Sequence, residues 1–258
     1  MDINIIHYED CIEGIRTRIE ANQIDLIIAD PPFGIDFHKM GTQYHRKPDY
    51  VIGGYSEIPA EEYYEFTYNW LKEAQRVLKE TGSCYIISGW NNLKDVLNAI
   101  EAVQLNVLNH IIWKYQFGVF TKRKFVTSHY HILFTVKNPK TYFFTKIDHY
   151  PEDVWIINRP YSPGKEKNST KLPEVLIEKI IQYSSKEQAL VLDPFMGNGT
   201  TAVSCIKTNR NYIGFERNPD CQKIIEREIA EAKSFSKVQK EKELGLKSQK
   251  SLTQFLKK

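Results

Sequence analysis

The sequence predicts a doubly wound α/β domain, in which a mostly parallel sheet carries helices on both faces. Apolar strand patterns alternate with helical patterns along most of the chain. Several strands are short, continuous apolar runs, such as Leu26-Ile27-Ile28 and Leu190-Val191-Leu192, as expected where both faces of a sheet are covered. At 258 residues the chain is long enough to bury the core of one large domain.

Seven strands are expected, each an apolar stretch bounded by polar residues or turn formers. They are Ile3–His7, Asp25–Ala29, Ser83–Ser88, Val107–Lys114, Tyr130–Lys137, Ala189–Leu192 and Tyr212–Phe215. Little sequence separates the strand ending at Lys114 from the one beginning at Tyr130. This pair is therefore expected to be antiparallel.

Helical patterns fill the intervals between these strands. The clearest is Glu61–Lys79, whose apolar side chains recur on one face and which Gly82 is expected to end. The others are Leu93–Val103, Glu174–Tyr183, Thr200–Lys207 and Pro219–Ala232. Residues 1–232 are therefore expected to form the main domain.

Three segments depart from this alternation. Residues 34–59 and 138–171 are long and rich in turn formers, as binding loops and lids often are. Residues 233–258 form a lysine-rich tail, which is either a solvated helix or a disordered basic arm, with or without contact to nucleic acid.

Composition excludes several classes of protein. No apolar run reaches the roughly twenty residues of a membrane span, and the N-terminus lacks the pattern of a secretion signal, so a cytoplasmic protein is expected. Cys11, Cys84, Cys205 and Cys221 are scattered, without a CxxC pair or a histidine at metal spacing, and are expected to be reduced thiols that bind no metal. The net charge of +3 is too small to indicate a nucleic-acid partner by itself.

The first chemical signal is Asp30-Pro31-Pro32-Phe33, directly after an apolar strand. Side chains at the carboxyl end of such a strand lie where α/β enzymes bind their ligands. Prolines lack N–H groups, so a carboxylate and a proline carbonyl offer two acceptors to one amino group. An aromatic ring beside them suits stacking on a base. The alternative is a strand followed by a Pro-Pro turn, with Asp30 capping local N–H groups.

The second signal, the Gly loop, is Asp193-Pro194-Phe195-Met196-Gly197-Asn198-Gly199-Thr200-Thr201, again between an apolar strand and a helix. The glycines allow positive φ and close approach of a ligand. Glu216, at the end of the next strand, follows Asp193 by twenty-three residues. That spacing is typical of an acid that binds a ribose diol, and it favours a nucleoside-like cofactor over a Gly-rich turn with a solvated glutamate.

These two motifs, in this order, resemble those of the DNA amino-methyltransferases of the β arrangement, in which the catalytic motif precedes the cofactor motif. The resemblance covers most of residues 1–232. It implies a Rossmann-like class I S-adenosylmethionine-dependent methyltransferase fold, with a circularly permuted, mostly parallel seven-stranded sheet. It also implies that the strands ending at Asp30 and Asp193 are neighbours.

The resemblance assigns roles to individual residues. Asp30, Pro31, Pro32 and Phe33 correspond to the catalytic motif. Asp10, Cys11, Asp30, Thr170, Asp193, Phe195, Gly197, Asn198, Gly199, Thr200, Thr201 and Glu216 correspond to cofactor-binding positions. Asp10 is equally well explained as the N-cap of a helix through Arg18. The segment Asn168–Pro173 matches the family's HPTxKP-like pattern only at Thr170 and Pro173, which leaves its contacts to the cofactor carboxylate in doubt.

Asp at the first position of the motif is typical of adenine-N6 enzymes in this family. The expected reaction is therefore methyl transfer from S-adenosylmethionine to N6 of a flipped-out adenine in DNA, without a metal. Three alternatives stay open: a cytosine-N4 DNA enzyme, an amino-methyltransferase acting on RNA or a protein amide, and a non-catalytic cofactor-binding subunit.

The expected partner is DNA, in a restriction-modification system, with a homodimer and a cognate restriction endonuclease as further possibilities. Basic residues interleaved with aromatic ones suit phosphate contact and base stacking, although a solvated surface explains them too. Those expected to contact DNA are Lys39, Arg46, Lys47, Lys122, Arg123 and Lys124. Residues 34–59 are expected to order on DNA, and residues 138–171 to read its sequence.

Overall fold

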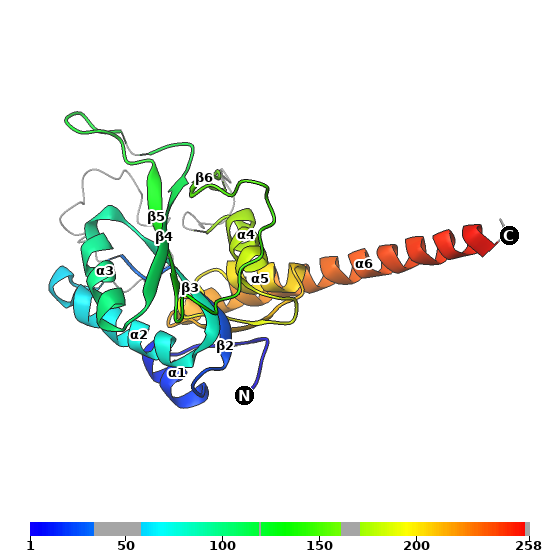
Figure 1. The fold of residues 1–258 in the computed structure, drawn as a ribbon, viewed down its shortest axis with the longest axis horizontal. Helices are drawn as coiled ribbons and strands as arrows, with labels where there is room; N and C mark the ends of the chain where they lie inside the picture. Colours follow the sequence, from blue (N-terminus) through cyan, green and yellow to red (C-terminus); the bar gives the residue numbers. More distant parts are fainter. Residues whose placement is uncertain (34–57, 119, 161–170, 256–258) are drawn as a thin grey trace.

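The computed structural model describes residues 1–33, 58–118, 120–160 and 171–255, with side chains as far as Val238 (Figure 1). The described residues form an eight-stranded sheet in the order β1-β8-β7-β2-β3-β5-β4-β6. The strands are β1 Ile5–His7, β2 Ile24–Ala29, β3 Leu78–Ser88, β4 Asn106–Lys114, β5 His129–Val136, β6 Val154–Ile156, β7 Leu190–Asp193 and β8 Asn211–Phe215. Only β5 runs against the other strands, which confirms the expected antiparallel pairing of β4 with β5.

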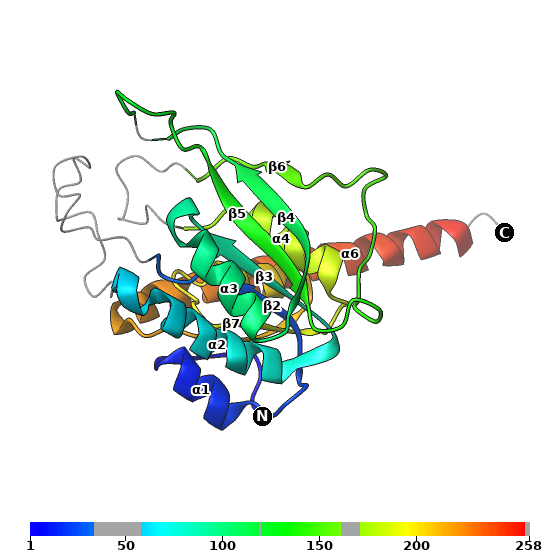
Figure 2. The same cartoon turned by 60° about the vertical axis from the view of Figure 1, so that its left-hand side comes forward.

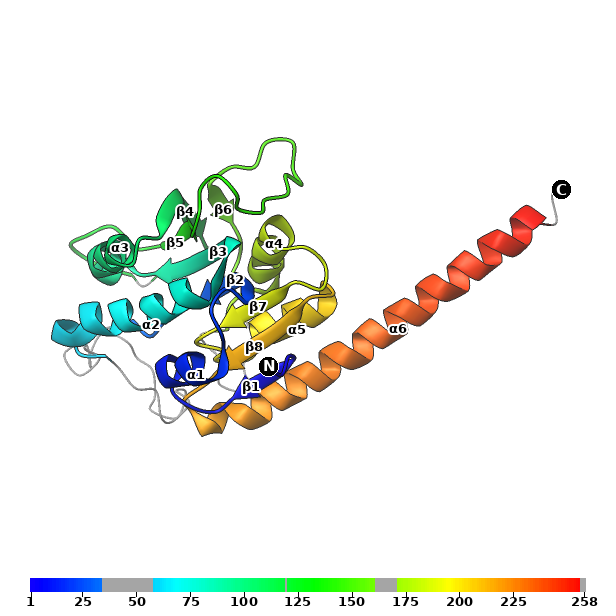
Figure 3. The same ribbon diagram turned by 60° about the horizontal axis from the view of Figure 1, so that its bottom comes forward.

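Helices cover both faces of this sheet, as predicted. They are α1 Cys11–Arg18, α2 Tyr63–Val77, α3 Leu93–Ala102, α4 Glu174–Ser184, α5 Thr200–Lys207 and α6 Gln222–Phe255, with short 3-10 turns at Ala60–Glu62, Trp90–Asn92 and Pro219–Cys221. Figure 3 shows α1, α2 and α3 on one side of the sheet and α4, α5 and the start of α6 on the other.

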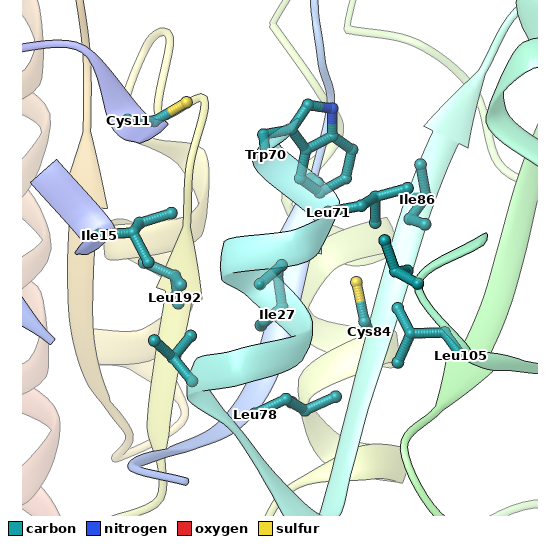
Figure 4. Packing of buried hydrophobic residues seen from close by; sticks show 14 of the residues in the cluster. Cys11, Ile15, Ile27, Trp70, Leu71, Leu78, Cys84, Ile86, Leu105 and Leu192 are labelled. Carbon is teal, nitrogen blue, oxygen red and sulfur yellow. The ribbon is translucent and has the colours of Figure 1, made fainter. Parts of the chain in front are cut away.

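Two apolar cores follow from this arrangement. The first lies under α1, α2 and α3, where Ile15, Trp70 and Leu71 pack against strand residues such as Ile27 (Figure 4). The second lies under α4, α5 and α6 and includes Ile177. Strand β2 contributes alternate residues to both cores, which explains why its sequence is an almost unbroken apolar run.

The structure differs from the sequence-based prediction at the end of α2. The helical pattern predicts a stop at Gly82, but the helix ends at Val77 and strand β3 begins at Leu78, so Gly82 lies inside the strand. Tertiary pairing explains the difference, because Leu78 already lies in register with Ile24 of β2. A helical pattern that continues into Lys79 is overridden by this pairing.

The structure adds two features to those predicted from the sequence. The short strand β6, inside the segment 138–171, adds an eighth strand by pairing in parallel with β4. The basic tail is helical rather than disordered as far as Phe255, and α6 extends away from the body of the molecule (Figure 1). Among the described residues, no helix has both the length and the apolar character needed to cross a membrane.

Candidate active site

The two motifs found in the sequence lie on neighbouring strands. Strands β2 and β7 are parallel and paired, with Leu26 opposite Val191 and Ile27 opposite Leu192. Asp30 directly follows β2, and Asp193 is the last residue of β7. The adjacency that the resemblance implied is therefore present, and both aspartates lie at the same carboxyl edge of the sheet.

The catalytic motif continues from β2 as irregular backbone. Pro31 is buried, and Asp30, Pro32 and Phe33 are partly buried. The Phe33 ring lies against the ring of Tyr130 on β5, with 5.5 Å between centroids. Among the described residues, no neighbouring N–H group donates to the Asp30 carboxylate, so the alternative in which Asp30 caps a local turn has no support there.

Both aspartates titrate far from their ordinary range. Burial is the main cause that raises the pKa of Asp30 to about 7, and the charge of Asp193 adds to it while Arg159 opposes it. Although part of the Asp30 residue is still accessible, the surroundings of its carboxyl group disfavour the charge. Burial also raises the pKa of Asp193 to about 7, against hydrogen bonds that stabilise its ionised form.

Asp193 organises the Gly loop that follows it. One of its carboxylate oxygens accepts a hydrogen bond from the Phe195 backbone N–H at 2.9 Å, and the other accepts one from the Thr201 hydroxyl. Gly197 and Gly199 adopt positive φ values of 54° and 81°. A Cβ on Gly199 would also lie 3.3 Å from a side-chain carbon of Ile225, so only glycine fits this position without strain.

Glu216 holds the opposite side of the loop. Its two carboxylate oxygens accept hydrogen bonds from the backbone N–H groups of Gly197 and Asn218, each at 2.7 Å. Burial is the main cause that raises the pKa of Glu216, and backbone hydrogen bonds oppose it. Each carboxylate oxygen has a second lone-pair site, so the group keeps acceptor capacity for a ribose diol.

The side chain of Asn198 indicates whether the Gly loop suits a cofactor. The residue is only 9% exposed, and its side-chain oxygen is buried without a hydrogen-bond partner. A buried acceptor without a donor is unfavourable unless a ligand satisfies it. The ammonium group in the amino-acid moiety of S-adenosylmethionine is a donor of the required kind. The residues present therefore fit this cofactor.

Other predicted cofactor positions have structural roles in the protein. Asp10 caps α1 by accepting hydrogen bonds from the Ile12 and Glu13 N–H groups at 2.9 and 3.3 Å, which confirms the N-cap interpretation. Cys11 and Thr200 are buried. The Phe195 ring packs on α2, edge-on to Trp70 at 5.4 Å. Contact of these residues with the cofactor stays a prediction, and Thr170 lies outside the described residues.

The residues predicted to contact DNA are divided between described and undescribed segments. Lys122, Arg123 and Lys124 are exposed in the connection between β4 and β5, beside the fully exposed ring of Phe125 (98%). Figure 2 shows this connection extending past the end of the sheet. Lys39, Arg46 and Lys47 lie outside the described residues.

The structure also brings residues to the site that the sequence analysis missed. Tyr130 on β5 contacts Phe33, and Arg159, in the segment after β6, acts electrostatically on Asp30. Tyr115, which follows β4, packs against both Tyr130 and Arg159. The strand pattern placed Tyr130 at the start of β5, and a hairpin register would have brought it near Tyr115. No sequence signal identifies Arg159, because its position depends on the unpredicted strand β6.

Comparisons with known proteins agree with this geometry. The fold is that of class I S-adenosylmethionine-dependent methyltransferases. PvuII DNA methyltransferase (cytosine-N4-specific) matches with a TM-score of 0.69 and 16% identity, over 90% of this chain and 91% of that protein. M1.HpyAVI matches with a TM-score of 0.66 and 22% identity, over 87% and 98% respectively.

Sequence similarity identifies the family. The N6/N4 methyltransferase family, described as DNA methylase, matches residues 24–227. The type II methyltransferase M.HinfI of Haemophilus influenzae is 31% identical over 260 residues, which cover 90% of this chain and 69% of that protein. The chain belongs to the N6/N4 DNA methylase family.

Proposed function

We propose that this protein transfers the methyl group of S-adenosylmethionine to N6 of adenine in DNA, as the modification enzyme of a type II restriction-modification system. The adjacency of Asp30 and the Gly loop carries the proposal, because it juxtaposes an acceptor for an amino group with a cofactor site. M.HinfI, a type II methyltransferase, supports the biological context. M1.HpyAVI, solved as its SAM complex, supports the cofactor.

The chemistry proposed for Asp30 follows from the nature of the target. An exocyclic amine is a weak nucleophile because its lone pair is delocalised into the ring. The Asp30 carboxylate and the carbonyl of Pro31, which has no competing N–H of its own, accept the two amine hydrogens and favour a tetrahedral nitrogen. When bound, the sulfonium of the cofactor supplies an activated methyl group. Transfer of this methyl group would leave the cofactor as the neutral thioether S-adenosylhomocysteine, and the Asp30 carboxylate is placed to accept the proton that the methylated nitrogen would release.

Access to the amine requires the base to leave the duplex, at an expense of a few kcal/mol of stacking and pairing. Phe33 is partly buried against Tyr130, and a ring held in this way offers a stacking surface for the extruded base. Asp at the first motif position favours adenine. Because PvuII methyltransferase combines this fold with cytosine-N4 specificity, the test must identify the base that is modified.

The test is methyl transfer from labelled S-adenosylmethionine to unmethylated genomic DNA, followed by digestion to nucleosides and mass spectrometry. We expect label in N6-methyladenine, and a loss of at least about 100-fold in Asp30→Ala. Asp95→Ala, at a partly exposed position in the first turn of α3, is the matched control and should retain activity. Label in N4-methylcytosine would overturn the choice of base. Transfer to RNA or protein alone, or none at all, would overturn the DNA substrate or the enzymatic role.

A further inference from the structure

Arg159 occupies a cage of aromatic rings beside the catalytic motif. Its guanidinium carbon lies 5.4 Å from the ring centroid of Tyr115 and 5.4 Å from that of Tyr130. The two tyrosine rings are themselves in contact, with 5.4 Å between centroids. A planar guanidinium gains both stacking and electrostatic attraction from such faces, which a lysine ammonium matches only in part.

The backbone of the chain around Arg159 is fixed by hydrogen bonds to β4 and the residues after it. The Arg159 N–H donates to the side-chain oxygen of Gln116 at 2.8 Å, and the Gln116 amide donates back to the Arg159 carbonyl at 2.9 Å. The Trp113 indole N–H donates to the carbonyl of Ile157 at 2.8 Å. The guanidinium therefore belongs to a segment held in register by β6 and its partner β4.

This cage contacts the catalytic motif through one aromatic ring, and its charge acts on the Asp30 carboxyl group. The Tyr130 ring lies 5.5 Å from the Phe33 ring, centroid to centroid, and 5.4 Å from the Arg159 guanidinium carbon. Arg159 also acts electrostatically on Asp30, where it opposes the charge of Asp193. Among the described residues, Asp193 at the end of β7 and Arg159 after β6 are the charged groups that influence Asp30.

We propose that Arg159 is a positioning residue for methyl transfer: it fixes the aromatic wall behind Phe33 and stabilises the ionised form of Asp30. The inference rests on the proposed function. It links the described residues after β6 to the catalytic motif through the Tyr130 ring. A purely structural arginine would fix the wall without affecting how the rate depends on pH.

The experiment measures single-turnover methyl transfer between pH 5.5 and 9 in Arg159→Gln and Arg159→Lys, with Arg16→Gln on the surface of α1 as control. The ionised Asp30 carboxylate accepts one amine hydrogen while the Pro31 carbonyl accepts the other, so activity is lost as the pH falls through the pKa of Asp30. Removal of the guanidinium raises that pKa and moves the acidic limb to higher pH. For Arg159→Gln we expect a rate at pH 6.5 at least about tenfold below that of Arg159→Lys, and a rate at pH 9 close to that of Arg159→Lys, because both variants lack the planar stack and only the Gln variant lacks the charge.

Arg159→Lys keeps the charge but not the planar stack. We expect it to retain the acidic limb of wild type and to be slower at every pH. Calorimetry should show S-adenosylmethionine binding within about twofold of wild type in both variants, since a factor of two is under 0.5 kcal/mol. An unchanged acidic limb in Arg159→Gln would overturn the proposal. So would loss of folding or cofactor binding in both variants, which would make Arg159 a structural residue only.

A second readout does not depend on turnover. A carbon-13 NMR titration of the Asp30 carboxyl should show its midpoint at higher pH in Arg159→Gln than in Arg159→Lys. If wild type transfers no methyl group to DNA while this difference is present, the proposed function fails and the coupling of Arg159 to Asp30 stands. If the midpoints coincide, the coupling fails whatever the substrate is.

Discussion

Asp30 and Asp193 place two carboxyl groups side by side at one edge of the sheet, where burial disfavours the charge of both. Asp193 offsets part of this penalty through hydrogen bonds from Phe195 and Thr201. Asp30 has no such local donors among the described residues, so its charged form is stabilised only by Arg159 and by whatever binds there. The residue that carries the proposed chemistry is thus one that destabilises the free protein at neutral pH.

Replacement of Asp30 by asparagine should therefore stabilise the protein at alkaline pH. The folded pKa of about 7 lies above the ordinary value of 3.8, so the native state binds more protons than the unfolded state between these limits. Stability falls as the pH rises through that window. An asparagine side chain at this position stays neutral and avoids the loss, so Asp30→Asn should raise Tm by about 3 °C at pH 8 and change it little at pH 4.

Calorimetric melting at both pH values, with Asp95→Asn as the matched control, measures this difference. An equal change in Tm at pH 4 and pH 8 would contradict the burial of charge at Asp30, because a packing effect does not depend on pH in this way. The same variant should lose methyl transfer, so stability and activity should change in opposite directions.

At the scale of single elements, the Gly loop joins β7 to α5 in a conformation that other residues do not adopt easily. Gly199 has a φ of 81°, immediately before the first turn of α5, and a Cβ at this position would lie 3.3 Å from a side-chain carbon of Ile225 on α6. Glu216 fixes the loop from the end of β8 by accepting the Gly197 N–H. A substitution at Gly199 therefore strains the backbone even where it changes no contact with the cofactor.

Gly199→Ala should lower the free energy of unfolding by about 1–2 kcal/mol, because an L-residue is unfavourable at positive φ. It should also weaken S-adenosylmethionine binding, since relief of the strain shifts Asn198. Gly89→Ala is the control: Gly89 has an ordinary extended backbone, and its added Cβ would lie 4.0 Å from Phe33. Denaturant unfolding and calorimetry test both variants. Equal stability of the two would show that the loop tolerates the substitution.

The elements themselves were largely predictable. The apolar runs of β2 and β7 and the pattern of α5 indicate their type and place, because both faces of the sheet are buried and alternation is weak there. The boundary between α2 and β3 could not be predicted, because pairing of Leu78 with Ile24 overrides a local helical pattern. Strand β6 is only three residues long, and its short β-prone run lies inside a segment rich in turn formers, so the sequence analysis assigned the whole segment to a loop.

At the scale of the whole molecule, the site depends on contacts that no local pattern contains. Asp30 and Asp193 are far apart in the sequence and meet only because β2 pairs with β7. Family resemblance anticipated this adjacency, but it gave no information on Arg159, whose place is set by β6 and by Gln116. The strand ends, the Gly loop and the aromatic cage all lie at the same edge of the sheet, and the β4–β5 connection extends beyond it (Figure 2).

This arrangement leads to a prediction about the approach of DNA. Lys122, Arg123 and Lys124 are exposed on the connection that extends past the proposed active site. If each neutralises one phosphate, replacing all three with Gln should make the slope of log binding constant against log salt shallower by about 2 to 3 units. Filter binding or fluorescence anisotropy at several salt concentrations measures this slope.

The control for this variant must remove the same number of charges elsewhere. Arg16, Lys72 and Lys186 are exposed on α1, on α2 and before β7, and a triple Gln variant at these positions lowers the net charge equally. If long-range attraction alone brought DNA to the protein, both triple variants would flatten the salt dependence alike. If the salt dependence becomes shallower only in the Lys122–Lys124 variant, DNA contacts the protein at the β4–β5 connection, because counterions are released only where phosphates are neutralised directly.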